Sequence, residues 1–129
     1  MLTQRTVVDP RDAKLERLHR VAVEGLKQCG RAWLLELAPP PVAQFADAIA
    51  MCAAAGRRLV VADAMGQAYR ASGAAEIALF VGPEGGLTAG ELETLRGAGA
   101  MVAKFGPHMM RIETAAGVAA ATIMQVEGA

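Results

Sequence analysis

The sequence predicts an α/β protein built on a parallel sheet with helices on both faces. Apolar runs of strand length alternate along the chain with longer segments of helical periodicity. Two of these runs end in Gly-Pro turns that lead directly into helical segments, as in the short connections of βα units. With 129 residues, 53% of them hydrophobic, the chain has the size and composition of one compact domain.

Helical spacing of apolar residues predicts a first helix near the N-terminus. Asp9 is a suitable N-cap and Pro10 a suitable first helical residue, and the helix is expected to run to about Gln28, where Gly30 ends it. The apolar face of this helix consists of Leu15, Leu18, Val21, Ala22 and Leu26.

The later elements follow the same alternation. A stiff run of three prolines separates the first predicted strand from the second helix, and a polar stretch over residues 63–75 follows the second strand. Aromatic residues are few, so Leu, Val, Ile, Met and Ala must fill the core. The predicted strands are residues 33–37, 58–62, 76–81 and 101–105, and the predicted helices are 42–55, 89–98 and 112–126.

The turn after the strand 76–81 has the features of a binding loop. It reads Gly-Pro-Glu-Gly-Gly over residues 82–86, and Gly82, Gly85 and Gly86 permit positive φ and close approach of a ligand to the backbone. Thr88 and Glu91 then have the spacing of a capping box. A tight βα connection without a ligand explains this stretch equally well.

A second turn of the same kind shifts the balance towards a ligand site. The strand 101–105 ends at Phe105, and Gly106 and Pro107 form a turn before the last helix. Because the carboxyl ends of neighbouring parallel strands meet at one edge of a sheet, both loops should border the same site.

The motifs resemble those of the RsmE family of SPOUT-class methyltransferases. The resemblance rests on GPEGG at 82–86, on FGPHMMRIETA at 105–115 and on EGLKQCGR at 24–31, and it covers nearly the whole chain. The chain departs from the family pattern at His108, where the family usually has Arg, and at Met109 and Met110, which replace Ile and Leu.

The resemblance implies a fold, a cofactor and a reaction. We expect residues 1–129 to form a single SPOUT-like methyltransferase domain with a C-terminal trefoil knot, acting with S-adenosylmethionine on N3 of a uridine in small-subunit ribosomal RNA. The family's N-terminal PUA-like RNA-binding barrel and its first strand and helix have no counterpart here. The sequence leaves open whether the chain is a natural short protein, a divergent paralogue or a fragment.

The resemblance also implies the roles of individual residues. Arg111 is the candidate for stabilising charge during catalysis, and Gln28, Arg31 and His108 are candidates for contact with the RNA. An Arg111 that only braces the loops through Glu84 or Glu113 is the structural alternative. Glu84 is expected to shape the site and Glu113 to have a structural role. The candidates for cofactor binding are Val81, Gly82, Pro83, Glu84, Gly85, Gly86, Phe105, Gly106, Met109 and Met110.

Charge and cysteine content restrict the possible functions. The net charge is zero, although RNA-binding proteins usually gain affinity by neutralising phosphates. Seven of the 13 basic residues lie in the first quarter, where a solvated helix face is an equally good explanation: Arg5, Arg11, Lys14, Arg17, Arg20, Lys27 and Arg31. Cys29 and Cys52 are too few for a metal site or a disulfide framework, so reduced thiols are expected. Without a signal peptide or a membrane-spanning run, a cytoplasmic location is the simplest expectation.

Two other functions remain open at this stage. A non-catalytic cofactor-binding or dimerisation module fits the neutral charge and the missing barrel. A phosphate-binding enzyme that uses the glycine turn is less suitable, because Glu84 would repel the anion. A homodimer is expected because the last helix carries a broad face of small and apolar residues: Ile112, Ala116, Ala119, Ala120, Ile123 and Val126.

Overall fold

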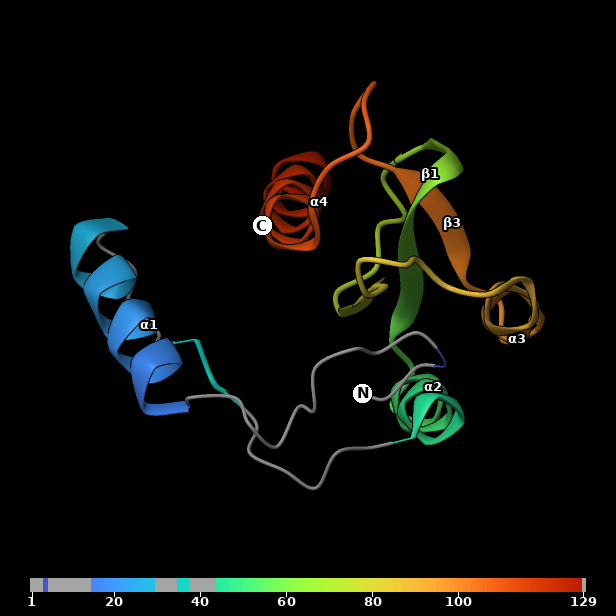
Figure 1. The fold of residues 1–129 in the computed structure, drawn as a ribbon, viewed down its shortest axis with the longest axis horizontal. Coiled ribbons are helices and arrows are strands. Elements are labelled where there is room, and N and C mark those ends of the chain that lie inside the picture. The colour runs from blue at the N-terminus through green and yellow to red at the C-terminus, as the bar shows by residue number, and fades with distance from the viewer. Residues whose placement is uncertain (1–3, 5–14, 30–34, 38–43, 129) are drawn as a thin grey trace.

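The computed structural model describes residues 4, 15–29, 35–37 and 44–128 (Figure 1). These residues contain four helices and three strands. In chain order they are α1 (Leu15–Cys29), α2 (Phe45–Ala54), β1 (Arg58–Ala68), β2 (Ile77–Val81), α3 (Ala89–Gly97), β3 (Met101–Lys104) and α4 (Ile112–Glu127).

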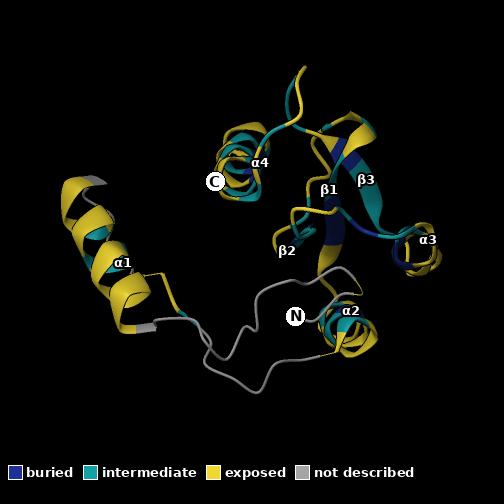
Figure 2. Ribbon diagram, in the orientation of Figure 1, coloured by how far each residue is buried: buried dark blue, intermediate teal, exposed yellow. Residues whose placement is uncertain are grey.

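The three strands form one parallel sheet in the order β2-β1-β3. Alternate residues of the central strand β1 serve two cores. Leu59 and Val61 pack with residues of α2 and α3, whereas Val60 packs with Ile123 of α4. Helices therefore cover both faces of the sheet, as predicted, with α4 on one side and α2 and α3 on the other (Figures 1 and 2).

The strand β1 is longer than predicted. It continues to Ala68, although its unbroken apolar run ends at Ala62 and Asp63 follows. An irregularity in the pairing allows this, because Ala62 and Gln67 both lie opposite Ala103 of β3. Gly66 lies within the irregular segment, and its lack of a side chain lets the chain pass against the backbone of β3. The predicted polar stretch from residue 63 was therefore wrong over its first six residues.

Only part of the structure predicted for the N-terminal region can be compared with the described residues. The end of the first helix at Cys29 agrees with the predicted end near Gln28, whereas its predicted start at Asp9 and Pro10 lies outside the described residues. Within the predicted strand 33–37, residues 35–37 are described and lie in neither a helix nor a strand. The apolar alternation there has no sheet partner, so this prediction was wrong for those three residues.

The start of α3 is held by the predicted capping box. The Glu91 backbone N–H donates to Thr88 Oγ1 at 3.3 Å, and the Thr88 backbone N–H donates to Glu91 Oε2 at 2.8 Å. Glu91 is a buried carboxylate, and its other oxygen accepts a hydrogen bond of 2.8 Å from the backbone N–H of Gln4. The box therefore fixes both the start of α3 and one point of the N-terminal segment.

A carboxylate near the C-terminus ties α4 to the connection between β1 and β2. Glu127 accepts hydrogen bonds from the Tyr69 hydroxyl, from the Ser72 backbone and side chain at 2.8 and 2.9 Å, and from the Gly73 backbone at 2.9 Å. The bond from Tyr69, followed by those from Ser72, lowers the pKa of Glu127 to about 2. The Tyr69 ring also stacks on Phe105 at a centroid distance of 5.4 Å. Tyr69 thereby connects α4, through Glu127, to Phe105, the residue that follows β3.

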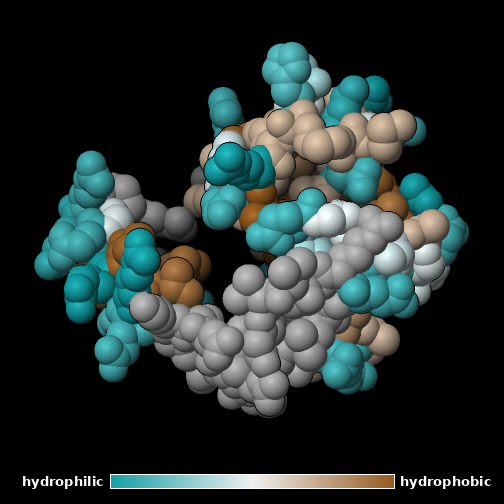
Figure 3. Space-filling view, viewed as in Figure 1, coloured by the Kyte–Doolittle hydropathy of each residue, from teal (hydrophilic) through white to brown (hydrophobic). Residues whose placement is uncertain are grey.

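Two further features concern the helices of the described residues. Neither core cluster contains a residue of α1, and Leu18 and Val21 on this helix are exposed. Hydrophobic surface is accordingly visible on α1 in Figure 3. None of the helices in the described part of the chain has the length and apolar character required to cross a membrane.

Candidate functional site

The carboxyl ends of all three strands meet at one edge of the sheet, as parallel pairing requires. A cavity of about 850 Å³ lies at this edge. Its walls come from the end of β1, the loop after β2, and the segment from the end of β3 into α4. A cavity of this volume at such an edge is of the size that small-molecule sites have.

The loop after β2 is a tight turn. The Gly86 backbone N–H donates to the Pro83 carbonyl at 2.8 Å, and Gly86 has a φ of 70°. Gly82 and Gly85 have no positive φ, so the predicted need for glycine conformations applies to Gly86 alone among the three. Gly82 is required by space instead, because a Cβ there would lie 3.1 Å from the Leu87 side chain.

The segment between β3 and α4 is more open. Phe105, Gly106 and Met110 are half-buried along the cavity, whereas His108 and Met109 are exposed. Arg111 is the N-cap residue of α4, with φ −64° and ψ 152°, and its exposed side chain lines the cavity.

Arg111 does not brace the loops in the way that the structural alternative requires. The structure describes Arg111, Glu84 and Glu113 fully, and it contains no ion pair between the arginine and either carboxylate. All three side chains nevertheless line the cavity. The guanidinium is therefore placed to meet a ligand.

The cavity brings together most of the residues singled out from the sequence. All ten candidates for cofactor binding line it, and so do His108 and Arg111. Gln28 is exposed on α1 and does not contribute to the cavity lining, and Arg31 lies outside the described residues. The individual roles of all these residues remain predictions.

Sequence reasoning missed the contribution of β1 to the site. Asp63 and Met65 line the cavity, and Asp63 Oδ1 accepts a hydrogen bond of 2.8 Å from the Met65 backbone N–H. Lys104 at the end of β3 was also missed. The available signal was topological, because the end of the central strand must lie between the ends of its two neighbours.

The cavity lining carries charge of both signs. Asp63 comes from β1 and Glu84 from the loop after β2, whereas Lys104 is the last residue of β3 and Arg111 directly precedes α4. Within the described residues, no three His, Cys, Asp or Glu side chains gather as they would around a metal ion. The site is therefore suited to an organic ligand that itself carries both charges.

Comparison with known proteins identifies the family. Residues 1–124 match the model of an RNA methyltransferase domain, and the chain belongs to this family. It is 33% identical over 128 residues to the ribosomal RNA small subunit methyltransferase E of Synechocystis sp., a match that covers 95% of this chain and 42% of the relative. The predicted resemblance to RsmE is thereby confirmed.

Solved structures show the same fold. A methyltransferase E from Neisseria gonorrhoeae bound to S-adenosylmethionine superposes with a TM-score of 0.74 at 23% identity, covering 96% of this chain and 52% of that one. A putative methyltransferase from Legionella pneumophila, also bound to S-adenosylmethionine, gives a TM-score of 0.73 at 23% identity with the same coverage. The chain thus spans about half the length of the proteins it matches.

Proposed function

We propose that this chain is an S-adenosylmethionine-dependent methyltransferase that acts on N3 of a uridine in small-subunit ribosomal RNA. The observation that carries the proposal is the cavity, whose lining comes from both Gly-Pro loops and from β1. Family membership and the bound cofactor in two relatives of the same fold support it. We further propose a trefoil knot at the C-terminus and a cytoplasmic location, as the resemblance implies.

The residues present fit the proposed cofactor. S-adenosylmethionine carries a positive sulfonium, a positive ammonium and a negative carboxylate, and the cavity offers Asp63 and Glu84 as well as Lys104 and Arg111. Apolar contact is available from Val81, Phe105 and Met110. When bound, the cofactor supplies an electrophilic methyl group.

The residues of this chain supply position and charge for the reaction. Uracil N3 carries a weakly acidic proton, so methylation there requires that the developing anion be stabilised. The Arg111 guanidinium can donate two parallel hydrogen bonds to a uracil oxygen or to a phosphate. The hydrogen bond that closes the turn at Gly86 holds the loop after β2 in place, and the half-buried Phe105 holds the segment after β3.

Calorimetric titration tests the cofactor assignment. The chain is expected to bind S-adenosylmethionine saturably at one site and to bind adenosine diphosphate at least tenfold more weakly, a difference of about 1.4 kcal/mol. The expectation rests on Glu84, which lies in the glycine turn and would repel a phosphate held by that turn. Tighter binding of the nucleotide would instead favour the phosphate-binding enzyme considered from the sequence.

A homodimer is also proposed, through the part of the expected α4 face that stays exposed together with apolar surface on α1. Ala119 and Ile123 are buried, and Ile123 packs against Val60, so part of the small-residue face of α4 serves the core. Exposed apolar residues remain at Val126 on α4 and at Leu18 on α1. Sedimentation at concentrations on the order of tens of micromolar is expected to show a dimer. A monomer throughout would contradict this.

The second candidate function is a cofactor-binding or dimerisation module without activity. It is favoured by the zero net charge. Methyl transfer separates the two functions, because the module would bind the cofactor and transfer nothing.

A further inference from the structure

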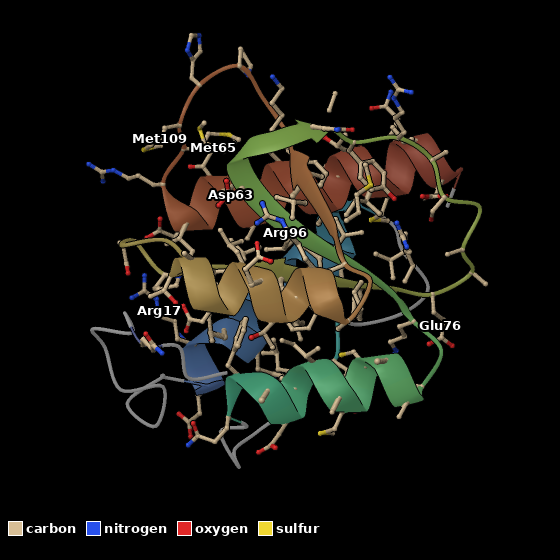
Figure 4. All side chains as sticks on the ribbon, turned by 90° about the vertical axis from the view of Figure 1, so that its right-hand side faces the viewer. Arg17, Asp63, Met65, Glu76, Arg96 and Met109 are labelled. Carbon is tan, nitrogen blue, oxygen red and sulfur yellow. The ribbon has the colours of Figure 1, made fainter. Side chains whose placement is uncertain are left out.

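Two exposed methionines stand at the mouth of the cavity. Met65 has an exposed fraction of 93% and Met109 of 88%, and both line the cavity from different segments. Met65 belongs to the far part of β1, whereas Met109 belongs to the segment between β3 and α4. Figure 4 shows both side chains on the same side of the molecule as Asp63, and all three residues line the cavity.

These side chains require an explanation, because large apolar groups are costly to leave in water. A small ligand inside the cavity would be held by its half-buried lining, such as Phe105 and Met110, and would leave the protruding thioethers uncovered. A larger partner lying across the mouth would cover them. Thioethers are polarisable and adaptable, and they make favourable contacts with aromatic rings.

Charge beside the two methionines indicates the kind of partner. His108 and Arg111 lie on the same segment as Met109, Lys104 is the last residue of β3, and all three line the cavity. Proteins hold single-stranded nucleic acid by pairing basic side chains with its phosphates and by stacking its nucleobases, usually on aromatic side chains. Unpaired bases are what sequence-specific RNA recognition engages.

We propose that Met65 and Met109 form a platform that receives the flat base of an unpaired RNA nucleotide at the mouth of the cavity. The platform places that base over the cavity that holds the methyl donor, so the inference rests on the proposed function. Aromatic residues, which usually supply such a platform, make up only 4% of this chain.

Methionine oxidation offers a direct test, because hydrogen peroxide converts an exposed thioether to its sulfoxide with release of water. Met51 is a control within the same chain, since it is 68% exposed on α2 and is absent from the cavity lining. The rates at the three residues are measured by mass spectrometry of the full chain. The oxidation rates are measured for the chain alone, for the chain with S-adenosylhomocysteine, and for the chain with an oligouridylate of about ten nucleotides.

The oligouridylate is expected to slow oxidation of Met65 and Met109 by about fivefold or more relative to Met51, as a stacking contact of about 1 kcal/mol would give. An abasic oligomer of the same length keeps the phosphates and is expected to protect neither. Equal protection by the abasic oligomer, protection by S-adenosylhomocysteine alone, or no protection at all would each overturn the proposal.

Substitution gives an independent measurement. Met65→Ala and Met109→Ala are each expected to weaken oligouridylate binding by about fivefold, and Met51→Ala should have no effect. Cofactor affinity is measured by calorimetry in the same three variants and should stay unchanged in Met51→Ala, which lies outside the cavity lining. Failure of the wild-type chain to bind the cofactor would count against the proposed function, whereas unchanged RNA affinity in both cavity variants would count against the platform.

Discussion

Arg111→Lys is expected to lower methyl transfer to small-subunit ribosomal RNA by roughly 10²-fold and to leave the affinity for S-adenosylmethionine nearly unchanged. Lysine keeps the positive charge, but it cannot donate two parallel hydrogen bonds to a planar acceptor. The structure gives Arg111 no ion pair with Glu84 or Glu113, so the substitution breaks no salt bridge between the loops. Incorporation of tritiated methyl groups measures the rate.

Arg96→Lys is the matched control for this experiment. Arg96 is exposed on α3, where it forms an ion pair with Glu93 at 2.5 Å, and it does not contribute to the cavity. Its substitution should leave both the rate and the cofactor affinity at wild-type values. If Arg111→Lys also transferred methyl groups at the wild-type rate, Arg111 would have no catalytic role.

Gly66→Ala is expected to destabilise the fold by about 1–3 kcal/mol or more. A Cβ at this position would lie 2.7 Å from the Val102 carbonyl oxygen and 2.8 Å from the Ala103 nitrogen. Both atoms belong to the backbone of β3, so neither can move aside as a flexible side chain could. The free energy of unfolding in urea, followed by circular dichroism, measures the effect.

Gly117→Ala is expected to have the opposite effect on the free energy of unfolding. Gly117 lies within α4, and a Cβ there would meet nothing within 4 Å. The substitution should therefore stabilise the protein by up to about 1 kcal/mol through helix propensity. A Gly66→Ala variant as stable as wild type would show that the extended part of β1 does not lie against β3 in solution.

Local sequence patterns were enough to predict the sheet and the two loops. The apolar runs ending at Val81 and Phe105 gave β2 and β3 within one residue at each end, and the spacing of Thr88 and Glu91 gave the capping box. Each of these features depends on neighbours in the chain. Their meeting in one cavity followed from the parallel arrangement alone.

Features that depend on distant parts of the chain were not predicted. The extension of β1 past Ala62 depends on an irregular pairing with β3, which no local pattern indicates. Asp63 and Met65 enter the site only through this extension. Glu127 binds Tyr69 and Ser72 across more than fifty residues of sequence, and such pairs leave no spacing to recognise.

The central claim is that this chain transfers a methyl group to N3 of a uridine. The most direct measurement incubates the chain with S-adenosylmethionine and small ribosomal subunits, digests the RNA and identifies the methylated nucleoside by mass spectrometry. The assay is run with the chain alone and with the part of a relative that it does not span supplied as a fusion. The account predicts 3-methyluridine in at least the fused form. The yield should fall in Arg111→Lys as far as its rate of methyl transfer falls. Absence of 3-methyluridine from both forms, with the cofactor bound, would contradict it.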